Sequence, residues 1–313
     1  MNRNYAPSHH AYQSGFTLIE LMISLVLGLL ISAAVIQVYI INVRTITVQQ
    51  SASEVQDSTI FALQSLDDHI RIANLGNPES SINDTTNHGG IVLTATNLGA
   101  SNATESKYFT KSNGTTGWAG PSNITDINSD QLTIQYKNIT PHTLYDCKGK
   151  DIPARSSEWV VERYFVRLDT GATAGTGLQD LVLACDAGRV DEEGNVTADF
   201  NGKGEVIIGA IDQFQVLLGT MTDISQLSYL PAKTYLELTD KPAITSVKLG
   251  VIVRSTTPLI ADTDTDKFTV LGTPQKLKTD TTAGKYYRRS YESTVLLRNA
   301  RVMSVTAVSP AKP

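Results

Sequence analysis

A single carboxylate, Glu20, lies within a long apolar run that covers residues 16–41. A charged group at bilayer depth is costly, and such groups usually mark a function or a partner. The attraction between opposite charges is also strongest where the dielectric constant is low. Two interpretations of Glu20 remain open. It is either an acid that pairs with a cation, or an acid near the membrane surface that reaches water or takes up a proton.

The sequence carries no recognisable catalytic pattern. The histidines that follow residue 15 are His69, His88 and His142, and none belongs to a His-Glu-x-x-His motif. The sequence also lacks Cys-x-x-Cys, Gly-x-Ser-x-Gly and a phosphate-binding glycine motif. We therefore expect a protein that is not an enzyme and that has no cofactor.

Charged side chains indicate neither a nucleic-acid partner nor a metal centre. The net charge is −5 and no dense run of Lys and Arg occurs, so the electrostatic signature of nucleic-acid binding is absent. Asp262, Asp264 and Asp266 could offer oxygen ligands to calcium. They lack the glycine and the distal glutamate of an EF-hand loop, so we expect a solvated acidic turn there.

The element that positions Glu20 is a predicted membrane helix. Residues 16–41 exceed the roughly 20 apolar residues that span a bilayer as a helix. A secretory signal peptide has a shorter apolar stretch of about 7–15 residues followed by a small-residue cleavage site. The stretch therefore does not fit a secretory signal peptide, and we expect a membrane helix at residues 16–41 behind a short polar leader at residues 1–15.

The same helix is predicted to continue in amphipathic form over residues 42–76. Apolar and small residues recur there at spacings of three and four, which is typical of one buried helix face. No proline interrupts residues 16–77, and Asn74, Gly76 and Pro78 are stop signals. The predicted stripe consists of Val48, Ala52, Val55, Thr59, Ala62, Leu66, Ile70 and Ala73.

Residues 77–313 are predicted to form a β-rich globular head. Residues 77–130 are rich in Ser, Thr, Asn and Gly and predict long loops with a short strand at 90–94. Alternating, β-branched and aromatic residues predict strands at 131–136, 159–168, 178–184, 206–218, 247–253 and 285–302. The expected fold class is α+β, with one long helix packed on a mainly antiparallel sheet.

The residues from Gly15 to Met22, which read GFTLIELM, resemble the processing site of type IV prepilins. The resemblance implies cleavage between Gly15 and Phe16 by the prepilin peptidase and N-methylation of the new Phe16 amine. It also implies that Glu20 pairs with the Phe16 amine of a neighbouring subunit. Such an ion pair sets axial register more than it adds net stability. One departure is the leader end Gln13-Ser14, where the family usually has Lys or Arg.

Three later segments resemble PilW-type minor pilins. They read SLDDHIRIA at 65–73, IDQFQVLLG at 211–219 and YESTVLLRN at 291–299. The resemblance implies a minor subunit that helps to initiate assembly of a type IV pilus and lies at its tip. Its partners would be other minor pilins, the major pilin, the prepilin peptidase and the inner-membrane assembly machinery, with a tip adhesin as a further candidate.

Two other functions remain open from the sequence. A minor pseudopilin of a type II secretion system would share the anchor helix and the peptidase. An adhesin module would use the region 80–130 to meet a surface or a ligand, and it would need an exposed patch or pocket there. In each case the resemblance places the chain in the inner membrane with its head in the periplasm, and a pilus subunit would then move to the cell surface.

The topology implied by the resemblance bears on Cys147 and Cys185. It places both cysteines outside the cytoplasm, where disulfides persist. We therefore expect a bridge between them, which the chain-entropy model values at roughly 4 kcal/mol for a loop of this length. Two buried free thiols are the alternative.

Overall fold

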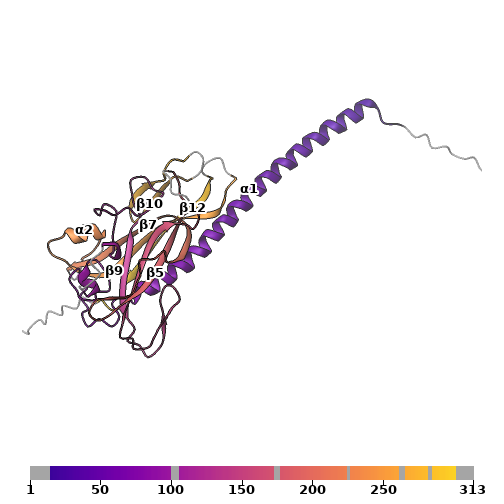
Figure 1. The fold of residues 1–313 in the computed structure, drawn as a ribbon. Helices are drawn as coiled ribbons and strands as arrows, with labels where there is room; N and C mark the ends of the chain where they lie inside the picture. The colour runs from indigo at the N-terminus through magenta and orange to yellow at the C-terminus, as the bar shows by residue number, and fades with distance from the viewer. Residues whose placement is uncertain are drawn as a thin grey trace, which may run out of the picture. The chain divides into compact units, whose positions relative to one another are not determined.

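The computed structural model describes residues 15–99, 106–172, 177–223, 226–260, 265–280 and 284–300. The chain divides into two compact units, Met1–Gln49 and Gln50–Pro313. Figure 1 shows the elements of both units along the chain. Asp262 and Asp264 lie outside the described residues, as do residues 301 and 302 of the predicted last strand.

Helix α1 (Leu18–Arg71) runs without interruption, as the absence of proline predicts. It ends five residues before the predicted position 76, and residues 72–76 form turns. Asn74 and Gly76 adopt φ angles of 65° and 80°. Left-handed residues of this kind end helices because they redirect the chain and release the last carbonyls to other donors.

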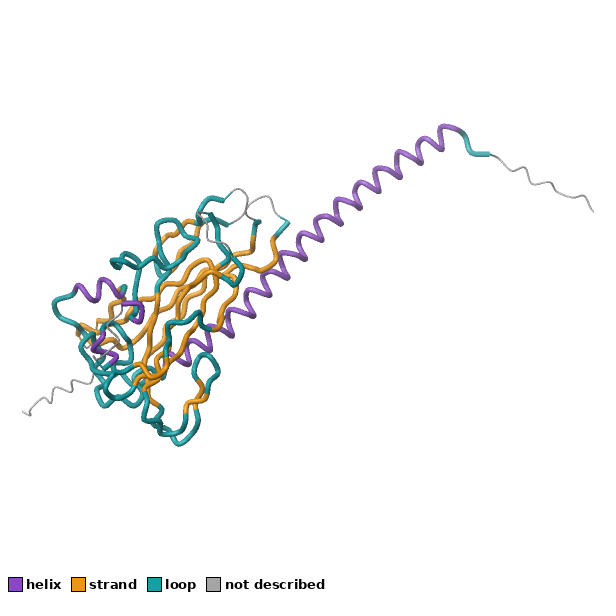
Figure 2. Tube along the Cα trace, in the orientation of Figure 1, coloured by secondary structure: helices purple, strands orange, loops and turns teal. Residues whose placement is uncertain are grey.

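The head is built on one large antiparallel sheet, drawn as the orange strands of Figure 2. Its strand order is β1-β4-β5-β7-β9-β12, and every neighbouring pair is antiparallel. The expected α+β class is therefore confirmed. The six strands are β1 (Gln131–Lys137), β4 (Trp159–Leu168), β5 (Leu181–Val190), β7 (Glu205–Asp223), β9 (Ala243–Pro258) and β12 (Tyr286–Leu296).

Smaller elements extend this sheet or lie beside it. Strand β6 (Val196–Ala198) pairs with β5, and β8 (Gln226–Leu230) pairs with β7. Two hairpins stand apart as separate ladders: β2 (Leu144–Tyr145) with β3 (Asp151–Ile152), and β10 (Lys267–Val270) with β11 (Thr273–Lys276). The short helices are α2 (Ala232–Glu237), η1 (Ala95–Leu98) and η2 (Ser106–Tyr108).

The predicted strands differ from the structure in several places. Strands β7 and β9 are longer than predicted, and β12 ends at Leu296, so residues 297–300, which were predicted as strand, lie outside it. Strand β5 begins later than predicted, at Leu181, and continues to Val190 through several polar residues. Residues 90–94 form no regular strand; Ile91 makes only an isolated bridge to Ile134 of β1. The segment lies close to the turn that ends α1, because an added Cβ at Gly90 would lie 2.4 Å from the Asn74 backbone nitrogen. Two backbone hydrogen bonds also join it to β1, from the Gln135 nitrogen to the Gly90 carbonyl and from the Val92 nitrogen to the Thr133 carbonyl.

Within the second unit, residues 50–71 of α1 bury one face against the sheet. The buried side chains are Ser51, Val55, Thr59, Leu63, Leu66 and Ile70. This face only partly matches the predicted stripe. Val48 is 39% exposed and the predicted Ala52 and Ala62 are only half-buried, whereas Ser51 and Leu63, which were not predicted, are buried. The last turns of the helix contact two separate strands of the sheet: Ser293 of β12 donates to Asp67, and His69 contacts Glu162 of β4.

Asn74 connects the end of the helix to distant parts of the head. Its side-chain amide donates to the carbonyl oxygens of Glu79 and Asn299, at 2.8 and 3.0 Å. Its side-chain oxygen accepts from the Gly90 nitrogen, and its backbone nitrogen donates to the Gln135 carbonyl. One buried residue thus fixes the turn, the following loop, β1 and the segment after β12.

Candidate processing and assembly site

The predicted cleavage site lies just outside the helix. Gly15, Phe16 and Thr17 are not helical, and α1 begins at Leu18. The Phe16 side chain is 92% exposed, and no atom lies within 4 Å of the place where a Gly15 Cβ would be. The peptide bond between Gly15 and Phe16 is therefore in an accessible, non-helical segment.

Thr17 and Glu20 form a capping box at the start of α1. The Glu20 Oε2 atom accepts hydrogen bonds from the Thr17 backbone nitrogen at 2.9 Å and the Thr17 hydroxyl at 2.8 Å. The Glu20 backbone nitrogen in turn donates to Thr17 Oγ1 at 3.3 Å. This reciprocal arrangement satisfies backbone donors that a helix start leaves open. The Thr-x-x-Glu spacing is a sequence signal from which this capping box could have been predicted.

Near Glu20, the Ser24 hydroxyl bonds within the helix, and the apolar side chains of this part of α1 are exposed. The Ser24 hydroxyl donates to the Glu20 carbonyl at 2.7 Å. Large apolar side chains between residues 18 and 41 are 46–78% exposed. An 18-residue window of α1 reaches a mean hydropathy of 2.5 with none of it buried, so length and composition allow this helix to cross a membrane. An exposed apolar surface this long is expected to be covered by lipid or by other helices.

Comparisons with protein families match both ends of the chain. Residues 10–36 match the prokaryotic N-terminal methylation motif, a range that contains Gly15, Phe16 and Glu20. Residues 164–299 match the family described as type IV pilus-assembly protein W, abbreviated PilW. The chain is therefore pilin-like, with the N-terminal methylation motif of pilins and a PilW-like head. The PilW match includes two of the three segments that carried the resemblance; the segment at 65–73 lies before it.

Other comparisons add little to this identification. No curated protein matches this pilin-like chain. Among solved structures, a type IV-like pilin from Thermus thermophilus is 11% identical, with a TM-score of 0.38. The similarity covers 78% of this chain and 96% of that one.

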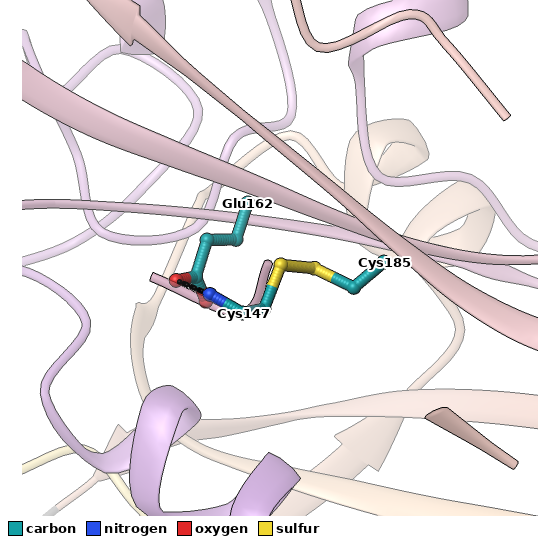
Figure 3. Close-up of side chains that lie close together, drawn as sticks. All are labelled: Cys147, Glu162 and Cys185. Atoms are coloured by element: carbon teal, nitrogen blue, oxygen red, sulfur yellow. Dashed lines mark hydrogen bonds between the residues drawn. A yellow bond between two sulfur atoms is a disulfide. The ribbon is translucent and has the colours of Figure 1, made fainter. Parts of the chain in front are cut away.

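In the PilW-like head, Cys147 and Cys185 form a disulfide (Figure 3). Cys147 lies in the turn between β2 and β3, and Cys185 lies in the middle of β5. Two ion pairs reinforce this attachment of the hairpin to β5. Arg189 Nη2 lies 2.7 Å from Asp146 Oδ2, and Lys148 Nζ lies 2.8 Å from Asp186 Oδ1.

Glu162 of β4 is fully buried beside this disulfide, and its carboxylate accepts several hydrogen bonds. The donors include the Cys147 backbone nitrogen at 2.9 Å, as Figure 3 shows, and the hydroxyls of Tyr136 and Tyr164 at 2.8 and 2.6 Å. Burial, with the negative charge of Glu162, raises the pKa of both tyrosines far above their ordinary value, so both stay protonated as donors.

His69 of α1 completes the group around Glu162, which we call the Glu162 cluster: Glu162, His69, Tyr136, Tyr164 and Cys147. His69 Nδ1 lies 3.0 Å from one Glu162 oxygen and 3.1 Å from the other. Burial alone would lower the pKa of His69. The hydrogen bond and charge of Glu162, together with the charges of Asp146 and Asp68, outweigh it, and the pKa is raised. The pair therefore favours an imidazolium bound to a carboxylate.

Three residues at this place, Cys147, Glu162 and Cys185, have the donor composition of a metal site but not the chemistry of one. The ligand atoms of Cys147, Glu162 and Cys185 lie within 4.8 Å of one another. Both sulfurs are consumed by their mutual bond, so neither is a thiolate. The carboxylate oxygens already accept from the protein's own donors. The cluster is therefore suited to joining α1, β4 and the β2–β3 hairpin, which is a structural task.

The sequence offered one unused signal for this cluster. Glu162 stands within the apolar stretch Trp159–Leu168, which was correctly predicted as a strand. A carboxylate inside a buried strand needs partners, so it predicts a polar cluster even when the partners are unknown.

The processing residues and the disulfide lie in different parts of the chain, since Gly15, Phe16 and Glu20 belong to the first unit and both cysteines belong to the second.

Proposed function

We propose that this protein is a minor pilin that helps to initiate type IV pilus assembly and lies at the pilus tip. In this proposal the prepilin peptidase removes residues 1–15, and the Phe16 amine is methylated. The apolar part of α1 first anchors the chain in the inner membrane with the head in the periplasm. It then packs among the helices of other pilins in the filament.

The observation that carries the proposal is the position of Glu20 on an exposed apolar helix directly behind the Gly15–Phe16 bond. Thr17 holds the Glu20 carboxylate at the helix start, beside the residue whose amine cleavage would create. A buried carboxylate needs a cation, and a neighbouring subunit's Phe16 amine supplies one. The pairing would select one axial position for each incoming subunit, because attraction at low dielectric constant falls steeply outside the pair.

Mass spectrometry of sheared, purified pili tests the proposal directly. No Lys or Arg lies between Phe16 and Arg44, so trypsin would release residues 16–44 as one peptide. We expect this peptide with an N-methylated Phe16, in amounts well below the major pilin. Recovery only of chains that still carry residues 1–15 would contradict the proposal.

A minor pseudopilin of a type II secretion system is the second candidate. It would use the same anchor and the same peptidase. The match of residues 164–299 to a pilus-assembly family favours the pilus. Deletion of the gene separates the two functions: we expect lost pili and twitching with normal exoprotein secretion. Lost secretion with intact pili would favour the pseudopilin.

A further inference from the structure

A polar hollow of about 750 Å³ opens on the head, away from the residues used so far. It lies between the loop of residues 76–88, Lys137 at the end of β1, Trp159 at the start of β4, and Glu192 in the loop after β5. The volume lies within the range of about 300–1,000 Å³ that is usual for small-molecule sites. Most such sites are lined by apolar side chains, whereas most residues that line this one carry amide, hydroxyl or charged side chains, beside the apolar Pro78 and Trp159.

A stacked aromatic pair, His88 and Trp159, lines part of the hollow. The rings of His88 and Trp159 are stacked, with centroids 4.6 Å apart and planes 1° apart. His88 Nε2 lies 3.1 Å from the Glu192 carbonyl oxygen, and Nδ1 lies 2.9 Å from Gln135 Nε2. These partners suit a neutral imidazole that donates from Nε2 and accepts at Nδ1. Burial lowers the pKa of His88, which also keeps the ring neutral.

The loop that forms the wall is fixed by its own side chains. The Asn77 amide donates to the carbonyl oxygens of Asn87 and His88 at 2.9 and 2.8 Å. Asn83 Oδ1 accepts from the Thr85 backbone nitrogen at 2.9 Å and from the Thr86 hydroxyl at 3.0 Å. The shape of the hollow therefore exists before any ligand arrives, which lowers the entropic cost of binding.

Several polar groups at the hollow remain available for a ligand. Within the described residues, the Asn87 amide and the Ser81 hydroxyl make no hydrogen bond of their own. Lys137 Nζ donates to Glu192 Oε1 at 2.8 Å, which leaves further Lys137 protons and the second Glu192 oxygen. The hollow thus presents neutral donors and acceptors around one neighbouring acid and base.

This chemistry excludes most classes of ligand. An apolar ligand would leave the lining groups unpaired, at roughly 1–3 kcal/mol for each buried group. A phosphate or carboxylate would meet two acids, Glu79 and Glu192, against the single base Lys137. A sugar hydroxyl donates and accepts at once. It can therefore bridge a carboxylate or amide oxygen and an ammonium or amide nitrogen.

We propose that this hollow binds a neutral saccharide, with Asn87, Lys137 and Glu192 as its polar contacts. Binding of this kind would add recognition of a glycan to the pilin function. It does not depend on that function, because it is a property of the folded head. The hollow includes residues 81–88, so it also supplies an exposed pocket for an adhesin role of region 80–130.

The test is saturation-transfer NMR, followed by calorimetry, on the full-length protein in a zwitterionic detergent that carries no sugar. The probes are methyl glycosides of glucose, galactose, mannose and N-acetylglucosamine, with lactose and chitobiose as disaccharides. A lysine-rich peptide is tested in parallel. We expect at least one saccharide to bind and the peptide not to bind.

Variants locate the binding. Glu192→Gln and Asn87→Ala should each weaken the affinity for that saccharide at least tenfold. Glu193→Gln is the matched control from the same loop, and Asn201→Ala is a matched exposed asparagine; neither residue lines the hollow. Both controls should stay within twofold of the unmodified protein. The proposal is overturned if no saccharide binds, if only the peptide binds, or if Glu192→Gln and Asn87→Ala leave the affinity unchanged.

Discussion

The imidazole of His69, in the last turn of α1, lies 3.0 Å from the buried carboxylate of Glu162 in β4. The two residues are far apart in sequence, and their contact joins the helix to the sheet. Glu162 also receives the Cys147 backbone N–H, so the same carboxylate holds the disulfide-bearing hairpin. The stability of the head should therefore depend strongly on this one side chain.

Glu162→Gln should lower the free energy of unfolding by about 3 kcal/mol. The amide group of glutamine would face donors where the carboxylate accepts, and His69 would lose its counter-charge. Denaturant unfolding of the purified protein measures the loss. Glu237→Gln, on the exposed side of α2, is the control and should change the value by less than about 0.5 kcal/mol. Equal stability of the two variants would show that the cluster is not stabilising.

Stability should fall as the pH rises from about 4 to about 7. Burial raises the pKa of Asp130 to about 7, although hydrogen bonds from the Val216 and Asn113 nitrogens act in the opposite direction. The pKa of an unfolded aspartate is near 3.8. Between pH 3.8 and about 7 the folded protein therefore holds a proton that the unfolded chain releases, and the free energy of unfolding falls as the pH rises. His69 also lowers stability as the pH rises, but at higher pH. Its pKa is raised in the folded state, so it stabilises the fold fully below pH 6.5, and this contribution is lost as the pH rises through the pKa of the folded state.

Unfolding curves collected at several pH values test this dependence. Asn cannot titrate, so Asp130→Asn should flatten the slope between pH 4 and 7 while lowering stability at every pH. The overall loss follows because the new NH₂ group must face a backbone N–H. A slope that is unchanged in Asp130→Asn would assign the effect to other groups.

Loss of the Cys147–Cys185 bridge should cost about 4 kcal/mol. The bridge closes a loop with a sequence separation of 38, and the estimate comes from the chain entropy that this loop removes from the unfolded state. The double variant Cys147→Ser, Cys185→Ser should therefore unfold at a lower denaturant concentration. Reductant should shift the unmodified protein to the same midpoint and leave the variant unaffected. If neither the double substitution nor the reductant lowers the midpoint, the bridge does not stabilise the head.

Glu20→Ala should reduce incorporation into filaments several-fold. The change removes both the charge and the capping-box acceptor, so Glu20→Gln is needed to separate the two. Glutamine keeps one oxygen for Thr17 but cannot pair with an amine as an anion. Immunoblots compare the protein in sheared pili with the protein in membranes. Ser24→Ala, which removes only a hydroxyl bonded within the helix, is the control. Normal incorporation of both Glu20 variants into filaments would contradict a role of Glu20 in assembly.

Local pattern was sufficient to predict the helix and most of the sheet. The apolar run and the missing proline predicted an uninterrupted helix, and β4 has the predicted bounds of residues 159–168. In each case the signal lies in neighbouring residues, because helix periodicity and strand alternation are local properties.

The second half of β5 could not be predicted in this way. Its polar residues are buried because partners from other segments satisfy them: Asp146 pairs with Arg189, and Lys148 pairs with Asp186. Gly188 is also required by a distant segment, since an added Cβ would lie 2.2 Å from the Ala198 carbonyl oxygen. The partners of Glu162 could not be predicted either, because they also come from distant segments. Only the acid within an apolar strand could be recognised from the sequence.

The hydrogen bonds of Asn74 also have a consequence for the order of events in the cell. The turn at residue 74 is completed by the carbonyl of Asn299, and the Arg298 nitrogen donates to the carbonyl of Arg71. Strand β12, immediately before these residues, forms one edge of the sheet. The turn that ends α1 therefore stays incomplete until Asn299 has been synthesised, and its final hydrogen bonds form only after β12 has been made.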